Sequence, residues 1–163
     1  MAKDLLPAYL AVGPDELKRN KMVERLKKRL DESFSAFNLD EFTGSTVDID
    51  VLVSALQTMP MGDSRRIVIL READKLSKAA SEVVILYLEN PNPTTTLLLT
   101  AQTLARTTRL YKAVAKIGAK SVVLCASMKP RELAPYVQKL AASYGLVIDF
   151  FFFFPRRRGV LIG

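Results

Sequence analysis

The chain has 163 residues, of which 49% are hydrophobic and 25% are charged, and its formal net charge at pH 7 is +7. This composition is typical of a folded globular protein with room for one ordinary domain and a fragment of another, so it disfavours disorder and a two-domain enzyme. The sequence contains no histidine, which excludes an imidazole base, an imidazole metal ligand and a Ser-His-Asp triad.

The single cysteine, Cys125, excludes an internal disulfide and a cysteine-rich zinc site. It follows the apolar run 121–124, so we expect a buried and unreactive thiol. The first residues lack the apolar segment of a signal peptide, and no stretch reaches the roughly 20 apolar residues of a membrane-spanning helix. The sequence therefore predicts a cytoplasmic protein that needs no membrane.

Five β-rich runs alternate along the chain with segments of helical periodicity. The runs are residues 8–12, 38–42, 66–70, 96–100 and 121–124. Three of them are almost continuously apolar, as is typical of parallel strands covered by helices on both faces. The alternation predicts an α/β fold with three layers, in which a doubly wound, mostly parallel five-stranded sheet lies between helices.

The first predicted helix follows the run 8–12. Pro14 and the two carboxylates of Asp15 and Glu16 mark its start, and apolar residues three to four positions apart predict a face that packs on the sheet. Most of its other positions are basic, namely Lys18, Arg19, Lys21, Arg25, Lys27, Lys28 and Arg29. These cations form either a solvated face with salt bridges to Glu24 and Asp31, or a surface that contacts DNA phosphates or an acidic protein. Lys21, Arg25 and Lys28 are the candidates for that contact.

Four more helices are predicted, within residues 51–59, 83–88, 110–117 and 133–144. Asp48 or Asp50 caps the first of them, and Pro60 ends it. Gly118 and Gly145 follow the last two, where we expect left-handed caps. The run of five phenylalanines at 150–154, which leads into the arginines at 156–158, matches neither the helical period nor the alternation of a strand. We therefore expect one domain over residues 1–145, followed at 146–163 by a remnant of a second domain or an aberrant tail.

The turn after the first strand is where a fold of this kind binds ligands. A phosphate-binding loop would need a second glycine, a lysine and a Ser or Thr for magnesium, but this turn offers only Gly13 and Lys18. At the end of the third strand, Arg71 occupies the position where an ATPase carries an acidic metal ligand. Gly13, Lys18 and Arg71 thus indicate a degenerate nucleotide site, and we expect no cofactor, no metal and no catalytic residue. Such a chain would be a structural or recruiting subunit of an assembly in which other subunits hydrolyse ATP.

The chain resembles the delta subunit of the bacterial DNA polymerase III clamp loader over residues 8–149. The matching segments occur in the same order, at 9–13, 37–42, 56–60, 65–69, 86–91, 104, 110–113, 131–133, 140 and 145–146. The resemblance implies an AAA+-like domain, related to P-loop proteins, that does not hydrolyse ATP. It also implies a replisome protein of the bacterial cytoplasm that works with the sliding clamp (beta subunit), with other clamp loader subunits and, through the complex, with DNA.

Members of this family open the clamp with a hydrophobic plug between the second helix and the third strand. Carried onto this chain, the plug falls on Met61 and Gly62, flanked by Met59 and Pro60. The family usually has two large apolar residues in succession there, and Gly62 departs from that pattern. A methionine adapts well to an apolar pocket, so Met61 would serve alone or with Met59.

Two other functions stay open from the sequence. One is an active ATPase of the P-loop type, which measured ATP binding would favour. The other is a free-standing DNA-binding module built on the basic helix, which salt-dependent binding to duplex DNA without a clamp would favour.

Overall fold

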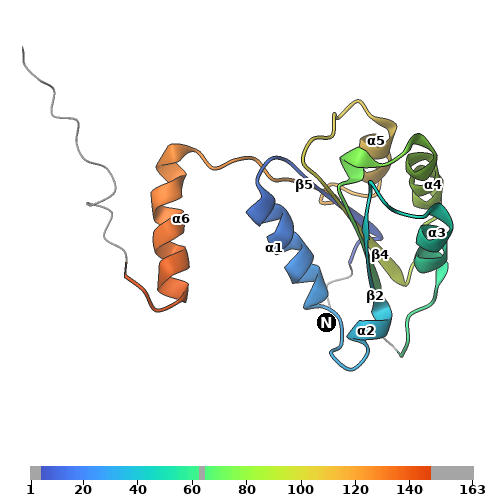
Figure 1. The fold of residues 1–163 in the computed structure, drawn as a ribbon, viewed down its shortest axis with the longest axis horizontal. Coiled ribbons are helices and arrows are strands. Elements are labelled where there is room, and N and C mark those ends of the chain that lie inside the picture. The colour runs from blue at the N-terminus through green and yellow to red at the C-terminus, as the bar shows by residue number, and fades with distance from the viewer. Residues whose placement is uncertain (1–4, 63–64, 148–163) are drawn as a thin grey trace, which may run out of the picture. The chain divides into compact units, whose positions relative to one another are not determined.

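The computed structural model describes residues 5–62 and 65–147 (Figure 1). The chain divides into two compact units, one ending at Ser127 and the other beginning at Met128. This division comes earlier in the chain than the domain boundary expected after residue 145. The predicted tail from residue 150 onward lies outside the described residues.

The described part of the first unit is built on a five-stranded parallel sheet with the strand order β2-β3-β4-β1-β5. Its strands are β1 Ala8–Val12, β2 Leu39–Thr43, β3 Arg66–Arg71, β4 Thr95–Ala101 and β5 Val122–Leu124. Leu10 in β1 lies opposite Leu99 in β4 and Val122 in β5. The predicted parallel sheet is confirmed, with each strand within two residues of its expected position.

Helices connect these strands at the positions that the periodicity predicts. They are α1 Glu16–Lys27, α3 Ile49–Gln57, α4 Lys78–Glu89 and α5 Arg109–Ala115. Helix α6 Pro130–Ser143 follows the last strand and belongs to the second unit. The four-residue helix α2 Ser35–Asn38 and the short 3-10 helix η1 Ala73–Lys75 were not predicted. Elements this short hold too few residues to show a periodicity.

The helices of the first unit cover both faces of the sheet (Figure 1). On one face, Val23 and Leu26 of α1 are buried in a cluster with Ile69 of β3. On the other face, α3, α4 and α5 pack in a larger cluster that includes Val84 and Leu97. Burial on both faces explains why the central strands are almost continuously apolar.

Because all five strands are parallel, they all begin at one edge of the sheet and all end at the opposite edge; these two edges run across the strands. The turn after β1 lies at the edge where the strands end. Helix α2 and the loop between α3 and β3 lie at the opposite edge, where the strands begin (Figure 1). The predicted nucleotide and plug positions are therefore at opposite edges of the sheet.

Most of the predicted helix ends are correct. Asp15 caps α1 by accepting a hydrogen bond from the Lys18 backbone N–H, and Asp48, not Asp50, caps α3. Gly145 has the expected left-handed conformation, with φ of 72°. The expectation for Gly118 is wrong, since its φ is not positive and α5 already ends at Ala115.

Candidate functional site

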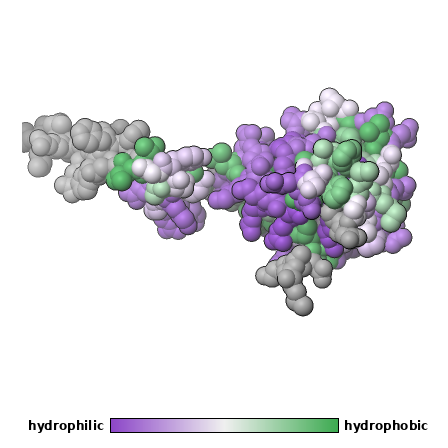
Figure 2. All heavy atoms as spheres, turned by 90° about the horizontal axis from the view of Figure 1, so that it is seen from below, coloured by the Kyte–Doolittle hydropathy of each residue, from purple (hydrophilic) through white to green (hydrophobic). Residues whose placement is uncertain are grey.

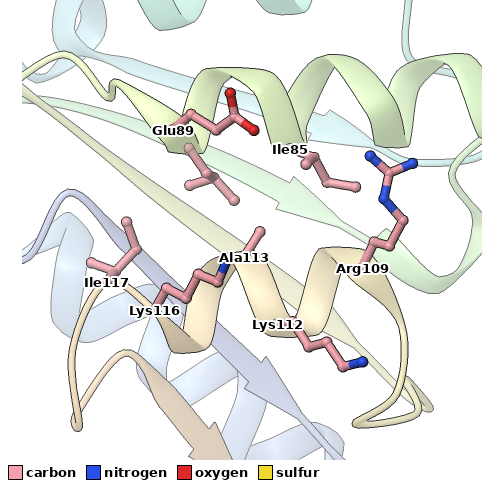
Figure 3. Close-up of a pocket in the computed structure, with 8 residues that line it drawn as sticks. Ile85, Glu89, Arg109, Lys112, Ala113, Lys116 and Ile117 are labelled. Atoms are coloured by element: carbon pink, nitrogen blue, oxygen red, sulfur yellow. The ribbon is translucent and has the colours of Figure 1, made fainter.

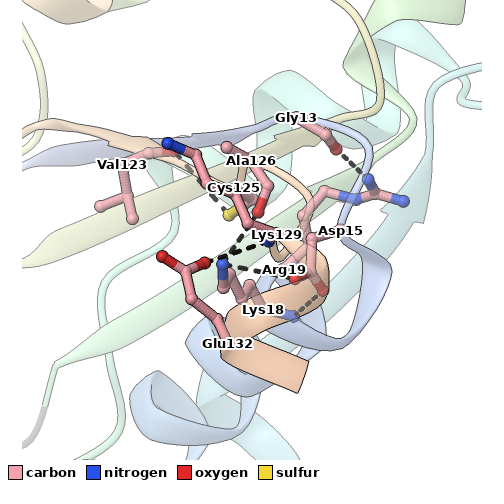
Figure 4. A network of polar contacts seen from close by, with 9 residues as sticks. All are labelled: Gly13, Asp15, Lys18, Arg19, Val123, Cys125, Ala126, Lys129 and Glu132. Atoms are coloured by element: carbon pink, nitrogen blue, oxygen red, sulfur yellow. Dashed lines mark hydrogen bonds and ion pairs between the residues drawn. The ribbon is translucent and has the colours of Figure 1, made fainter. Parts of the chain in front are cut away.

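The turn after β1 is closed by the chain's own groups. The Asp15 side chain accepts the Lys18 backbone N–H at 3.0 Å, at the helix end where a phosphate would otherwise bind. The Lys18 ammonium donates to the Ala126 carbonyl at 2.8 Å and lies 3.5 Å from the Asp15 carboxylate. Arg19 donates to the carbonyl of Gly13 (Figure 4). The cations of this turn therefore bind protein oxygens.

Gly13 brings the turn into direct backbone contact with the end of β5. Its φ is 142°, and a Cβ atom built there would lie 2.3 Å from the carbonyl oxygen of Cys125. Its N–H donates to the Ala101 carbonyl at 3.1 Å. Only glycine fits so close an approach, so the role of Gly13 in this structure is packing.

Arg71, at the end of β3, is held by two neighbouring elements. One guanidinium nitrogen donates to Asn20 of α1 at 2.9 Å, and Nε lies 3.3 Å from the Glu41 carboxylate of β2. The cavity beside it has a volume of about 160 Å³ and is lined by both acidic and basic side chains. Ligand pockets usually measure about 300–1,000 Å³, so this cavity is smaller than most of them.

Glu41 forms ion pairs with Lys27 and Arg71 across this face. Burial raises the pKa of Glu41, but its hydrogen bonds and charge interactions with Lys27 and Arg71 outweigh burial and hold the pKa below its ordinary value of 4.5. Because the pKa of Glu41 is lower in the folded state than in the unfolded state, its ionised carboxylate stabilises the fold at pH values above the unfolded-state pKa. This stabilisation is lost as the pH falls through the folded-state pKa.

We therefore expect Glu41→Gln to lower the free energy of unfolding by less than about 1 kcal/mol at neutral pH, because the side chain is partly solvent-screened. The difference from wild type should shrink as the pH is lowered below the ordinary range of glutamate. Urea unfolding at several pH values measures it. A difference that grows with falling pH would contradict the assigned ion pairs.

Cys125 is buried at the end of β5, with 1% of its surface exposed. Burial raises the pKa of its thiol; the positive charge of Arg19 opposes this rise and the negative charge of Asp15 adds to it. A thiol with a raised pKa and no exposure is a poor nucleophile. The prediction of a buried, unreactive cysteine agrees with this environment.

The predicted plug lies at the other edge of the sheet, on the loop after α3. Asn38, fully buried at the end of α2, accepts the Met61 backbone N–H at 2.7 Å and donates to the Met61 carbonyl at 3.0 Å. Arg66 of β3 holds the same region by donating to the Phe37 carbonyl at 2.9 Å and pairing with Asp40. The backbone of Met61 is thereby fixed to the core.

The side chains around this anchored backbone are exposed and apolar. Met59 is 74% exposed and Met61 is 52% exposed, and Phe34 and Phe37 beside α2 are 38% and 59% exposed. Figure 2 views the molecule from this end and shows hydrophobic spheres at the surface. We call Phe34, Phe37, Met59 and Met61 the loop patch. An exposed apolar patch on a fixed loop is typical of a protein-binding site.

Gly62, the second residue of the predicted plug, lies against a side chain of the loop patch. Gly62 has φ of 70°, and a Cβ atom there would lie 3.1 Å from the ring of Phe34. The Phe34 ring thus occupies space next to Gly62. Phe34, Phe37 and Asn38 were not among the residues predicted for the site, because nothing in the sequence shows that α2 and the loop after α3 meet.

The basic residues of α1 divide into two groups. Lys18 and Lys27 pair with Asp15, Glu24 and Glu41, which includes the predicted salt bridge to Glu24. Asp31 instead accepts the Ser33 backbone N–H. Lys21, Arg25 and Lys28 are exposed on one stripe, without an ion pair inside residues 5–62 and 65–147. Hydrophilic spheres gather on the α1 side of the first unit in Figure 2.

In the described part of the chain, no cluster of three or more acidic or cysteine side chains is placed to hold a metal ion. Within the same residues, no helix combines the length and the apolar character needed to cross a bilayer.

Comparisons with solved structures show a similar fold in three bacterial proteins. The Bacillus subtilis DNA clamp loader delta protein matches with a TM-score of 0.70 and 22% identity, covering 85% of this chain and 43% of that one. A Thermotoga maritima protein related to the DNA polymerase III gamma subunit gives 0.54 and 17%, covering 84% and 46%. A Thermotoga maritima RuvB variant gives 0.56 and 19%, covering 85% and 44%. The chain thus spans less than half the length of these proteins and has the AAA+-like fold.

A search of curated proteins gave no match. The family described as "DNA polymerase III, delta subunit" matches residues 9–126, which is well over half of the chain. Its match covers the sheet except for Ala8, together with the closed turn after β1 and the loop patch. The chain therefore belongs to the DNA polymerase III delta subunit family.

Proposed function

We propose that this chain is the clamp-binding part of a non-catalytic clamp loader subunit, which binds a bacterial sliding clamp and opens it for loading on DNA. The observation that carries the proposal is the loop patch: Met61 is exposed while the buried side chain of Asn38 fixes its backbone. A site held in place before binding loses little conformational entropy on association. Membership of the delta subunit family supports a sliding clamp as the partner.

The closed turn after β1 supports the non-catalytic part of the proposal. Asp15 occupies the start of α1, and Lys18 and Arg71 bind groups of the chain itself. Binding a triphosphate would require breaking these interactions and bringing its charge next to Asp15 and Glu16. We expect isothermal titration with ATP and Mg²⁺ to give no binding in the micromolar range.

Met61→Ala is the direct test of clamp binding. Burying one methionine side chain is worth about 1.5–3 kcal/mol, which corresponds to a loss of about tenfold or more in affinity for a purified bacterial clamp. Because the side chain is exposed, the melting temperature should stay nearly unchanged. Surface plasmon resonance with immobilised clamp, together with thermal unfolding, measures both quantities.

The matched control is Leu17→Ala. Leu17 is 63% exposed and lies in the first turn of α1, near the opposite edge of the sheet. It should leave clamp affinity unchanged. If Met61→Ala binds the clamp as tightly as wild type and Leu17→Ala, the assignment of the loop patch is wrong.

The exposed stripe of Lys21, Arg25 and Lys28 favours a second candidate function, which is direct contact with DNA. Cations without protein partners can release counterions from phosphates, so each contact steepens the salt dependence of binding. We expect the triple charge-reversal variant K21E/R25E/K28E to weaken binding to duplex DNA and to flatten its salt dependence. Fluorescence anisotropy at several salt concentrations measures both. An unchanged salt dependence would mean that this stripe faces solvent and does not contact DNA.

A further inference from the structure

A groove separates α4 and α5 on the face of the sheet away from α1. It has a volume of about 540 Å³, within the range of about 300–1,000 Å³ that is usual for binding pockets. Its apolar lining includes Ile85 and Leu88 of α4, which are buried, and Ala113 of α5 and Ile117 just after α5, which are partly buried. Figure 3 shows these side chains between the two helices.

The rim of this groove on α5 is basic. Arg109, Lys112 and Lys116 line it at intervals of three and four residues, and all three are exposed. Arg109 crosses the groove to pair with Glu82 of α4, which ties the two helices together. Lys112 and Lys116 form no ion pair with any residue in the described ranges, and Glu89 is the one carboxylate among the lining side chains.

We propose that this groove, which we call the α4–α5 groove, binds an acidic segment of a partner protein that inserts apolar side chains between the two helices. The apolar lining would take the apolar anchors, and Lys112 and Lys116 would pair with carboxylates beside them. An amphipathic helix that carries acidic residues on the edge of its apolar face has this chemistry. The proposal is independent of the loop patch and of clamp binding.

The shape of the site favours a protein segment over nucleic acid. DNA phosphates are bound by cations on a polar surface. Contact with the apolar side chains of Ile85, Leu88 and Ile117 would not stabilise a bound phosphate, because a charged group loses hydration on burial. An apolar recess with a charged rim is the usual anatomy of a protein interface.

The test uses the whole 163-residue chain and a fluorescent synthetic peptide. The peptide is helical, with leucines every three to four positions and glutamates flanking them, and a second peptide carries lysine in place of each glutamate. We expect the acidic peptide to bind the wild-type chain with micromolar affinity. The double variant K112E/K116E should bind this peptide about tenfold more weakly, or weaker still. Ala113→Phe, which fills the groove without changing charge, should weaken peptide binding similarly.

The control variant is K21E/K28E, which reverses two exposed cations on α1 and should leave the peptide affinity within about twofold of wild type. Thermal unfolding shows that each variant folds, and methyl NMR shifts of Ala113 and Ile117 report where the peptide binds. The proposal is overturned if the acidic peptide does not bind. It is also overturned if the lysine peptide or polyglutamate binds as tightly as the acidic peptide. The same holds if K21E/K28E weakens peptide binding more than K112E/K116E does, or if Lys112 and Lys116 are needed for binding duplex DNA instead of the peptide.

Discussion

Asn38→Ala is expected to lower the free energy of unfolding by about 2–4 kcal/mol, because it removes two hydrogen bonds and leaves the N–H and carbonyl of Met61 without that partner. The same change should weaken clamp binding by about tenfold, since the loop patch would have to be ordered on association. Urea unfolding with an unchanged m-value and surface plasmon resonance on the purified clamp measure the two effects.

The comparison variant is Asn90→Ala. Asn90 ends α4, where it is exposed, so the same chemical change there should alter stability by no more than about 0.5 kcal/mol. Clamp affinity should also stay constant. Equal stability of the two variants would mean that Asn38 does not fix the loop. A stability loss without any change in clamp affinity would separate the fold of this edge from clamp binding.

Gly13→Ala should destabilise the protein by about 3–5 kcal/mol. The added Cβ atom would lie 2.3 Å from the Cys125 carbonyl oxygen at a φ of 142°. The Cys125 backbone cannot move away without losing its bonds to Val12 at 2.7 Å and to Asp15 at 3.0 Å. Chemical denaturation measures the loss, and Met61 at the other edge should still bind the clamp wherever the variant is folded.

Gly118→Ala serves as the control for this substitution. A Cβ atom at Gly118 would lie 3.6 Å from the side chain of Leu6, which is ordinary contact, and its φ is not positive. Its stability should stay within about 0.5 kcal/mol of wild type. If Gly13→Ala is as stable as Gly118→Ala, the turn after β1 has room to rearrange, and it could then open for a ligand.

The sequence by itself determined the class of fold and most of the elements. Apolar runs such as 67–70 are buried on both sides and therefore show in composition. Helix starts show because a cap satisfies backbone groups within three residues, although the sequence left the cap of α3 open between Asp48 and Asp50. The missing parts of a phosphate-binding loop are also local, so the prediction of a degenerate site at Gly13, Lys18 and Arg71 needed no tertiary contact.

Only the tertiary structure decided what surrounds Met61 and what the cations bind. The bonds from Asn38 to Met61 join residues 23 positions apart, and the bond from Lys18 to Ala126 spans 108. Such contacts depend on how the connections pack at each edge of the sheet, which no local periodicity encodes. The groove between α4 and α5 has the same origin, because two helices from distant segments must lie side by side before their apolar and basic residues form one surface.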